Sequence, residues 1–180
     1  LNINSHPVNF TTEGFRDLFR EIGVLREIEV LKFIIPLETS LGAETLTQLG
    51  YSLHYLNKLK SLEISMNSNE FDDEGFEILG EGIAKCTHLK KLNLNIKAQK
   101  LTGKGMSRCI VSMHDKLPFA YATITINTSG GGGIHIEDFK RMNNTFKCIN
   151  GIKSWKVNLD APIMNFKAQV QTKKKDCNIF

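Results

Sequence analysis

The sequence lacks any long run of apolar residues. No stretch approaches the roughly 18 consecutive apolar residues that a membrane-spanning helix needs, although 41% of the chain is hydrophobic and 23% is charged. These fractions are typical of a soluble globular protein. The 180 residues are enough for one domain with a hydrophobic core. We therefore expect a single globular domain.

Neither sign of charge dominates the chain. The formal net charge is only +4, and part of it comes from the basic run at 173–175. A nucleic-acid-binding domain concentrates more basic residues on one face. The composition therefore argues against a nucleic-acid partner.

Cysteine is scarce, and its spacing is irregular. The four cysteines are Cys86, Cys109, Cys148 and Cys177, and no two of them have CxxC or zinc-site spacing. The first three fall at mostly apolar positions of expected helices, which is typical of small buried side chains in a reducing compartment. We expect no disulfide framework and an intracellular protein, cytoplasmic or cytoskeletal.

Catalytic motifs are also missing. The five histidines form no HxH or HExxH pattern, and the glycine run at 130–133 is not followed by the Lys-Ser or Lys-Thr of a P-loop. This run is interpreted as a lengthened turn. We expect no catalytic residues, no cofactor, no metal site and no small-molecule substrate, and hence a protein that is not an enzyme.

What the sequence does contain is a strand-like phrase that recurs five times. Its copies start 31, 30, 32 and 31 residues apart, at 28–33, 59–64, 89–94, 121–126 and 152–157. One further interval back from Leu31-Lys32-Phe33 lies Leu1-Asn2-Ile3. We therefore expect the chain to open inside a repeat, with earlier repeats or a cap before Leu1.

An amphipathic helix is expected between successive strands. Apolar residues at offsets 0, 3, 7 and 10 mark the buried stripe of a three-turn helix. These positions are Phe15, Leu18, Ile22 and Leu25; Leu46, Leu49, Leu53 and Leu56; Phe76, Leu79, Ile83 and Cys86; Met106, Cys109, Met113 and Lys116; and Phe139, Met142, Phe146 and Ile149. Thr11, Asp72 and Thr102 are placed to cap these helices, and Glu13, Glu44, Glu74 and Glu137 suit their first turns.

The repeating strand and helix predict an α/β fold in which parallel units stack and cover one another. One expected core layer contains Leu31, Leu62, Leu92, Ile124 and Trp155, and the next contains Phe33, Ile64, Leu94, Ile126 and Val157. The array is expected to cover residues 1–160. Residues 161–180 are expected to form a capping strand and a basic tail.

The LxxLxL phrases with a following helix, in units of about 30 residues, resemble leucine-rich repeats, most closely the ribonuclease-inhibitor-like subtype. The phrase LGEGIAKCTHLKKLNLNI (79–96) is similar to repeat arrays of ciliate protists. The resemblance implies a horseshoe-shaped solenoid of about five to six units, with a parallel sheet on its concave face. The Asn that this family often carries after the strand has a match at Asn67 or Asn69 but not in the neighbouring units.

Residues that alternate with the core leucines are expected on the concave face. They form three expected rows: Val30, Ser61, Lys91, Thr123 and Ser154; Asn2, Lys32, Glu63, Asn93, Thr125 and Lys156; and Asn4, Ile34, Ser65, Asn95, Asn127 and Asn158. These rows are mostly polar and mixed in charge. They fit either a solvated sheet face or a protein-binding surface. For partner binding we select Glu63, Ser65, Lys91, Asn93, Asn95, Thr125 and Asn127.

The leading functional prediction is a non-enzymatic protein-interaction module or a structural scaffold subunit of a larger assembly. By resemblance, this assembly would belong to the cytoskeleton or cilium. A first alternative is a small-GTPase regulator of the leucine-rich-repeat type, which needs a positioned cation in a strand-to-helix loop; Lys97, Lys100 and Lys104 are its candidates. A second alternative is a membrane-anchored adaptor, since Cys177-Asn178-Ile179-Phe180 has the form of a prenylation site after a basic run. The array can also be one piece of a larger multidomain chain.

Overall fold

The computed structural model describes residues 1–4, 11–39, 41–68, 70–114, 121–127 and 156–158, together with the single residues 137, 140 and 144. Six described strands form one parallel sheet in the order in which they occur along the chain. They are β1 (Asn2–Asn4), β2 (Val30–Thr39), β3 (Ser61–Ser68), β4 (Lys91–Ala98), β5 (Tyr121–Asn127) and β6 (Lys156–Asn158). Within the described ranges, a helix follows each of the first four strands: α1 (Thr12–Val24), α2 (Glu44–Leu53), α3 (Asp73–Lys85) and α4 (Gly103–His114).

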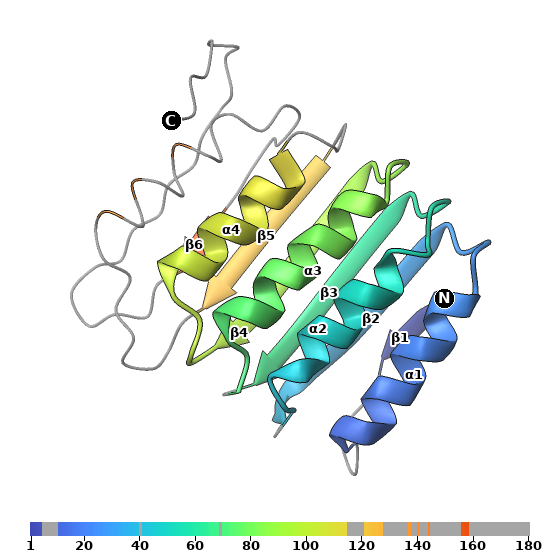
Figure 1. Cartoon of the computed structure of the whole chain (residues 1–180), viewed down its shortest axis with the longest axis horizontal. Helices are drawn as coiled ribbons and strands as arrows, with labels where there is room; N and C mark the ends of the chain where they lie inside the picture. The colour runs from blue at the N-terminus through green and yellow to red at the C-terminus, as the bar shows by residue number, and fades with distance from the viewer. Residues whose placement is uncertain are drawn as a thin grey trace.

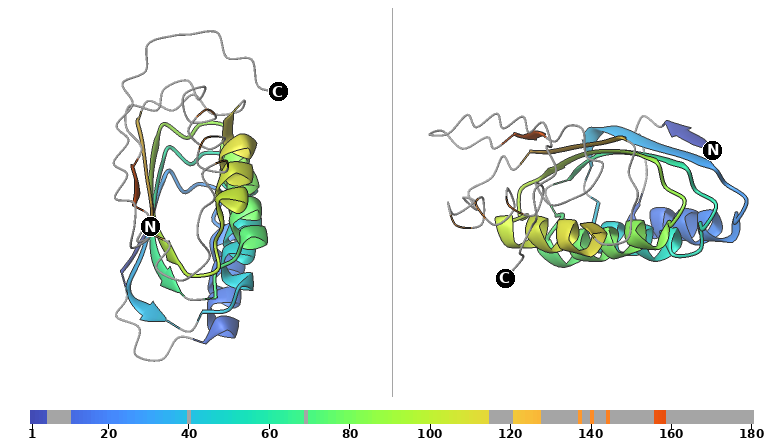
Figure 2. Two further views of the ribbon diagram at one scale, coloured as in Figure 1. Left: turned by 90° about the vertical axis from the view of Figure 1, so that its left-hand side faces the viewer. Right: turned by 90° about the horizontal axis from the view of Figure 1, so that it is seen from above.

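The fold has two layers (Figures 1 and 2). The four helices lie side by side on one face of the sheet, and they leave the opposite face of the strands uncovered by any described helix. A parallel strand needs a crossover to reach its neighbour, and each helix supplies one. The α/β class and the parallel sheet expected from the sequence are therefore confirmed.

Apolar side chains of β2, β3 and β4 fill the space between the layers. Leu31 pairs with Leu62, and Leu62 with Leu92, while Phe33, Ile64 and Leu94 form the next row. All six side chains are 3% exposed or less. The strands alternate strictly between buried and more exposed residues, which is the pattern of a sheet covered on one side only. Both expected core layers are confirmed across these three strands.

The register of β5 differs from the expectation by two residues. Ala122 lies opposite Leu92, and Ile124 lies opposite Leu94, whereas the repeated phrase predicts Ile124 opposite Leu92. A two-residue shift keeps every side chain on the same face of the strand, so the apolar pattern cannot distinguish the two registers. The expected pairing of Ile126 with Val157 of β6 is confirmed.

The helical stripe is confirmed in the described helices, with two corrections; Lys116 and the stripe positions Phe139, Met142, Phe146 and Ile149 lie outside the described residues. Its described members in α2, α3 and α4 are buried, but Leu18 is only partly buried and Leu25 is 48% exposed. Leu25 follows the first helix of the layer, and no described helix covers α1 on its outer side. The sequence stripe also omits Phe19, which is fully buried and packs on Phe33 with ring centroids 5.0 Å apart.

Side-chain caps begin three of the helices as expected. Thr11 accepts a hydrogen bond from the backbone N–H of Gly14, and Asp72 accepts one from that of Gly75. Thr102 accepts one from the N–H of Lys104 and also donates its hydroxyl to Asp73 at 2.6 Å. These bonds satisfy N–H groups that have no partner within the helix.

Glycines set the spacing of the helices. A Cβ atom on Gly50 would lie 2.5 Å from the carbonyl oxygen of Ile78 in α3, and one on Gly80 would lie 2.6 Å from that of Cys109 in α4. No side chain fits at such positions, so α2, α3 and α4 approach one another through their backbones. The equivalent position in α1 holds Phe19, and α1 does not share this glycine contact.

Several expectations lie outside the described residues. These are Trp155, which is the fifth member of the first expected core layer, the glycine run at 130–133, the whole segment 161–180 and, within it, Cys177. Among the described residues, no helix combines the length and apolar character needed to cross a bilayer.

Candidate interaction face

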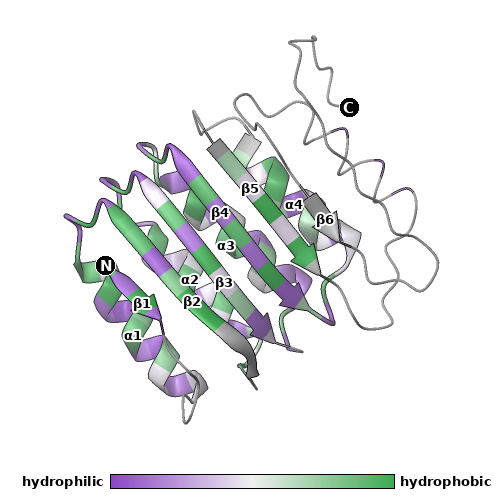
Figure 3. Ribbon diagram, turned by 180° about the vertical axis from the view of Figure 1, so that it is seen from behind, coloured by the Kyte–Doolittle hydropathy of each residue, from purple (hydrophilic) through white to green (hydrophobic). Residues whose placement is uncertain are grey.

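The candidate site is the open face of the sheet, on the side away from the helices (Figure 3). Figure 3 shows the sheet from this side, with hydrophilic and hydrophobic residues interspersed along the central strands. Lys91, Asn93 and Asn95 of β4 are exposed, while Glu63 and Ser65 of β3 are partly buried. The sheet is the rigid element that positions these side chains, since each strand is hydrogen-bonded along its length.

The strand register arranges these residues in rows across the sheet. One row runs Asn2, Lys32, Glu63, Asn93 and Thr123, and the next runs Asn4, Ile34, Ser65, Asn95, Thr125 and Lys156. The expected rows placed Thr125 beside Asn93 and Asn127 beside Asn95. Both placements are wrong by two residues, because β5 pairs with β4 in a register shifted by two residues.

Side-chain contacts connect the first row. The ammonium of Lys32 lies 2.9 Å from Oε2 of Glu63, and the side-chain amide of Asn93 donates to Oε1 of Glu63 at 3.4 Å. The Glu63 side chain is 28% exposed, so water still reaches the pair. An ion pair of this kind contributes about 0–1 kcal/mol to stability. Its main effect is to hold three side chains of three strands in one arrangement.

The second row has a similar contact. The side-chain amide of Asn95 donates to the hydroxyl of Ser65 at 3.1 Å. Thr125 follows Asn95 in this row, and it is partly buried. The structure therefore brings Glu63, Asn93, Ser65, Asn95 and Thr125 together on adjoining rows.

The two remaining predicted residues lie on the flanking rows. Lys91 is opposite Ser61 and Tyr121, and Asn127 is opposite Lys97 and Asn158. Val30, at the β2 end of the Lys91 row, is an apolar side chain with 45% exposure. The face therefore offers amide and hydroxyl groups at its centre, with lysines and apolar groups around them.

The lysines considered for a GTPase regulator do not share one loop. Lys97 belongs to β4 and Lys104 to α4, so only Lys100 lies in the connection between them. The ammonium of Lys100 is paired with Oε2 of Glu70 at 2.5 Å. This cation already has a carboxylate partner.

Groups with the chemistry of catalysis lie apart from one another. Cys86 and Cys109 are both buried free thiols. Burial raises the pKa of Cys86 to about 12, and burial together with nearby Glu77 raises the pKa of Cys109 as well. In the part of the chain that the structure describes, no three His, Cys, Asp or Glu residues are placed to hold a metal ion.

One surface feature was missed by sequence reasoning. A groove of about 400 Å³ lies on the helix side, between α1 and α2. Part of the signal for it was present: Arg16 and Arg20 are four residues apart, which places them on one side of α1. Tyr51 lies in α2, and Tyr55 lies in the turn that follows it. These residues do not belong to the apolar stripe and were therefore passed over.

A scan against protein-family models and a search of curated proteins found no match to this chain.

Proposed function

We propose that this chain is a leucine-rich-repeat array of the ribonuclease-inhibitor-like subtype that acts as a non-enzymatic protein-interaction module or structural subunit. Two features support the repeat assignment. The strand-like phrases recur about every 30 residues, and the strands lie in the sheet in chain order. In this proposal the sheet is the concave face of a horseshoe, and the protein works in the cytoplasm or the cytoskeleton.

The open face of the sheet is the proposed binding surface. The observation that carries this proposal is the pair of polar rows centred on Glu63–Asn93 and Ser65–Asn95. Amide groups can both donate and accept hydrogen bonds. A face of this kind suits a polar or extended protein segment, because its own groups are held in position before the partner arrives.

The test compares a face variant with a matched control in affinity purification of the tagged protein. Asn93→Arg with Asn95→Arg places two long cations on exposed positions at the centre of the face. Asn57→Arg makes the same change at an exposed loop position. We expect a stoichiometric set of proteins to co-purify with the native chain and the control, and to be lost with the face variant.

Two results would contradict the proposal. One is a set of bound proteins that the face variant retains in full. The other is stimulated GTP hydrolysis when the chain is added to co-purified GTPases, which would support the regulator hypothesis.

A further inference from the structure

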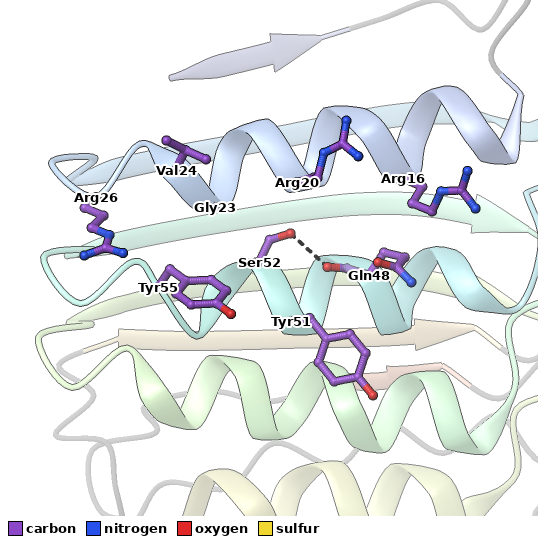
Figure 4. Close-up of a pocket in the computed structure, with 9 residues that line it drawn as sticks. All are labelled: Arg16, Arg20, Gly23, Val24, Arg26, Gln48, Tyr51, Ser52 and Tyr55. Carbon is purple, nitrogen blue, oxygen red and sulfur yellow. Dashed lines mark hydrogen bonds between the residues drawn. The ribbon is translucent and has the colours of Figure 1, made fainter.

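The groove between α1 and α2 lies on the side of the molecule opposite the proposed binding face (Figure 4). Its lining includes Gly23, which has no side chain, and the buried Ser52. The Ser52 hydroxyl donates to the carbonyl oxygen of Phe19 in α1 at 2.6 Å, and it also lies 2.9 Å from the carbonyl oxygen of Gln48. Figure 4 shows Ser52 between the two helices, with Tyr55 and Arg26 at one end of the groove and Arg16 and Gln48 at the other.

The local sequence explains why a groove forms here. Gly82 of α3 follows Ser52 by one repeat interval, and it contacts the backbone of Gly50 in α2 directly. Between α1 and α2 a serine hydroxyl stands where that glycine contact occurs, and bulky Phe19 stands in place of Gly50. The helices are therefore bridged by a side chain, and space remains above the bridge.

The walls of the groove are apolar and accessible. Val24 is 67% exposed, Tyr51 is 48% exposed and Tyr55 is 57% exposed. Single exposed apolar residues are ordinary on a protein surface, whereas these three line the same groove. Tyrosine supplies a large contact area and loses little conformational freedom when it is bound.

The charged groups that line the groove are all cationic. They are Arg16, Arg20 and Arg26, and no acidic residue lines the groove. Arg16 is paired with Glu13, and Arg20 with Asp17 and Glu21, at 3.1–3.7 Å. These pairs are exposed and therefore weak. A partner's carboxylates would compete with Glu13, Asp17 and Glu21 for Arg16 and Arg20.

A polyanion is a poorer match than a short acidic segment. The acidic residues Glu13, Asp17 and Glu21 stand on the same helix as Arg16 and Arg20, so α1 carries no surplus of positive charge. Nucleic-acid binding needs many cations along a phosphate backbone. A short partner segment needs only one or two carboxylates beside an apolar side chain, and the three arginines around the groove match that requirement.

We propose that the α1–α2 groove binds an acidic segment of a partner protein, with an apolar residue seated between Val24, Tyr51 and Tyr55. Carboxylates of the segment would pair with Arg20 and with Arg16 or Arg26. Tyrosine and arginine are the residues that most often dominate protein interfaces. The molecule would then have two separate protein-binding surfaces, one on the sheet and one on the helices.

The test is a selection of random 12-residue peptides displayed on phage against the full chain, with counter-selection on an Arg20→Glu/Tyr55→Ala double variant. We expect the selected peptides to share acidic residues around a leucine or an aromatic residue. Synthetic copies, measured by fluorescence anisotropy, should bind about tenfold more weakly to Arg20→Glu. Their affinity should also fall as salt concentration rises.

Matched controls separate the groove from the rest of the surface. Val111→Ala removes an exposed apolar side chain, and Lys104→Glu reverses an exposed charge, both on α4. Neither substitution should change binding, and Asn93→Arg on the sheet face should not change it either. Circular dichroism checks that each variant is folded.

Three results would overturn the proposal. They are a selection that yields no groove-dependent peptide, selected peptides without acidic residues, and a 12-nucleotide RNA that binds the groove more tightly than the peptides. Because Asn93→Arg is tested on both surfaces, a failure here is distinguishable from a failure of the proposed sheet-face function.

Discussion

A Cβ atom on Gly82 would overlap the carbonyl oxygen of Gly50, so α3 and α2 meet backbone to backbone at this point. The contact brings the two helices closer than any pair of side chains would permit. It also makes the packing of the helical layer sensitive to single methyl groups.

We expect Gly82→Ala to lower the free energy of unfolding by about 1–3 kcal/mol, because the added methyl group forces the helices apart. The change can be measured by urea denaturation. Gly14→Ala is the control, since a Cβ atom there would make only an ordinary contact with Thr11 at 3.4 Å. In a helix, alanine is favoured over glycine by about 0.5–1 kcal/mol, so the control should be neutral or stabilising. Equal stability of Gly82→Ala and the native chain would contradict the close approach.

Ser52 is 5% exposed, and its hydroxyl forms a hydrogen bond that bridges α2 to α1. We expect Ser52→Ala to cost about 1 kcal/mol of unfolding free energy, the usual net value of such a hydrogen bond. Ser107→Ala, at a partly buried position of α4, should cost less. Denaturation midpoints of the two variants give the comparison, and a larger loss for Ser107→Ala would show that the bridge is unimportant.

The Lys32–Glu63 pair can be measured by a double-mutant cycle with alanine at either position and at both. We expect a coupling energy of about 0.2–1 kcal/mol, because the pair is partly solvated. A coupling near zero in dilute salt would show that the two side chains do not hold each other in place.

His54 predicts a pH dependence of stability. Burial lowers its pKa below the ordinary 6.5, Lys85 lowers it further and Glu81 opposes this shift. Below pH 6.5 the unfolded chain therefore takes up a proton before the folded chain does, so stability decreases as the pH falls toward the folded-state pKa. Above 6.5 the contribution is complete. An NMR titration should give His54 a pKa below 6.5, and Lys85→Met should raise it; a folded-state pKa above 6.5 would contradict the burial argument.

Cys86 and Cys109 should resist alkylation in the folded protein, since only the thiolate is nucleophilic and burial raises both pKa values. Iodoacetamide labelling at pH 8, read by mass spectrometry of the separate peptides, should modify them only after denaturant is added. Rapid labelling of Cys86 without denaturant would indicate that the end of α3 opens readily.

The α/β class and the central core were predictable because the apolar pattern repeats regularly in β2, β3 and β4. Leu31, Leu62 and Leu92 occupy one layer, as their spacing requires. The register of β5 was not predictable, since shifts of two residues bury the same side chains. The prediction that Leu25 is buried was wrong for a different reason. Its burial depends on what lies beside α1, and a periodic apolar pattern carries no information about that.

The sequence likewise predicted one candidate site, the sheet face, but not the other, the groove between α1 and α2. The polar residues of β3 and β4 were placed correctly, because a strand's alternation fixes which face a side chain occupies. The groove depends on how closely two helices approach. Phe19 of α1 stands at the position of Gly50 in α2, and Ser52 of α2 stands at the position of Gly82 in α3. These differences set the distance between α1 and α2, and they are found only when the helices are compared with one another.

The chain-order arrangement of the strands also bears on how the protein folds. Every ladder from β1 to β5 joins strands about 30 residues apart in the sequence, so each closes a loop of similar length. The entropy of loop closure grows only with the logarithm of that length. No pairing must therefore wait for another, and any adjacent pair of strands with its helix can serve as the nucleus from which order spreads in both directions.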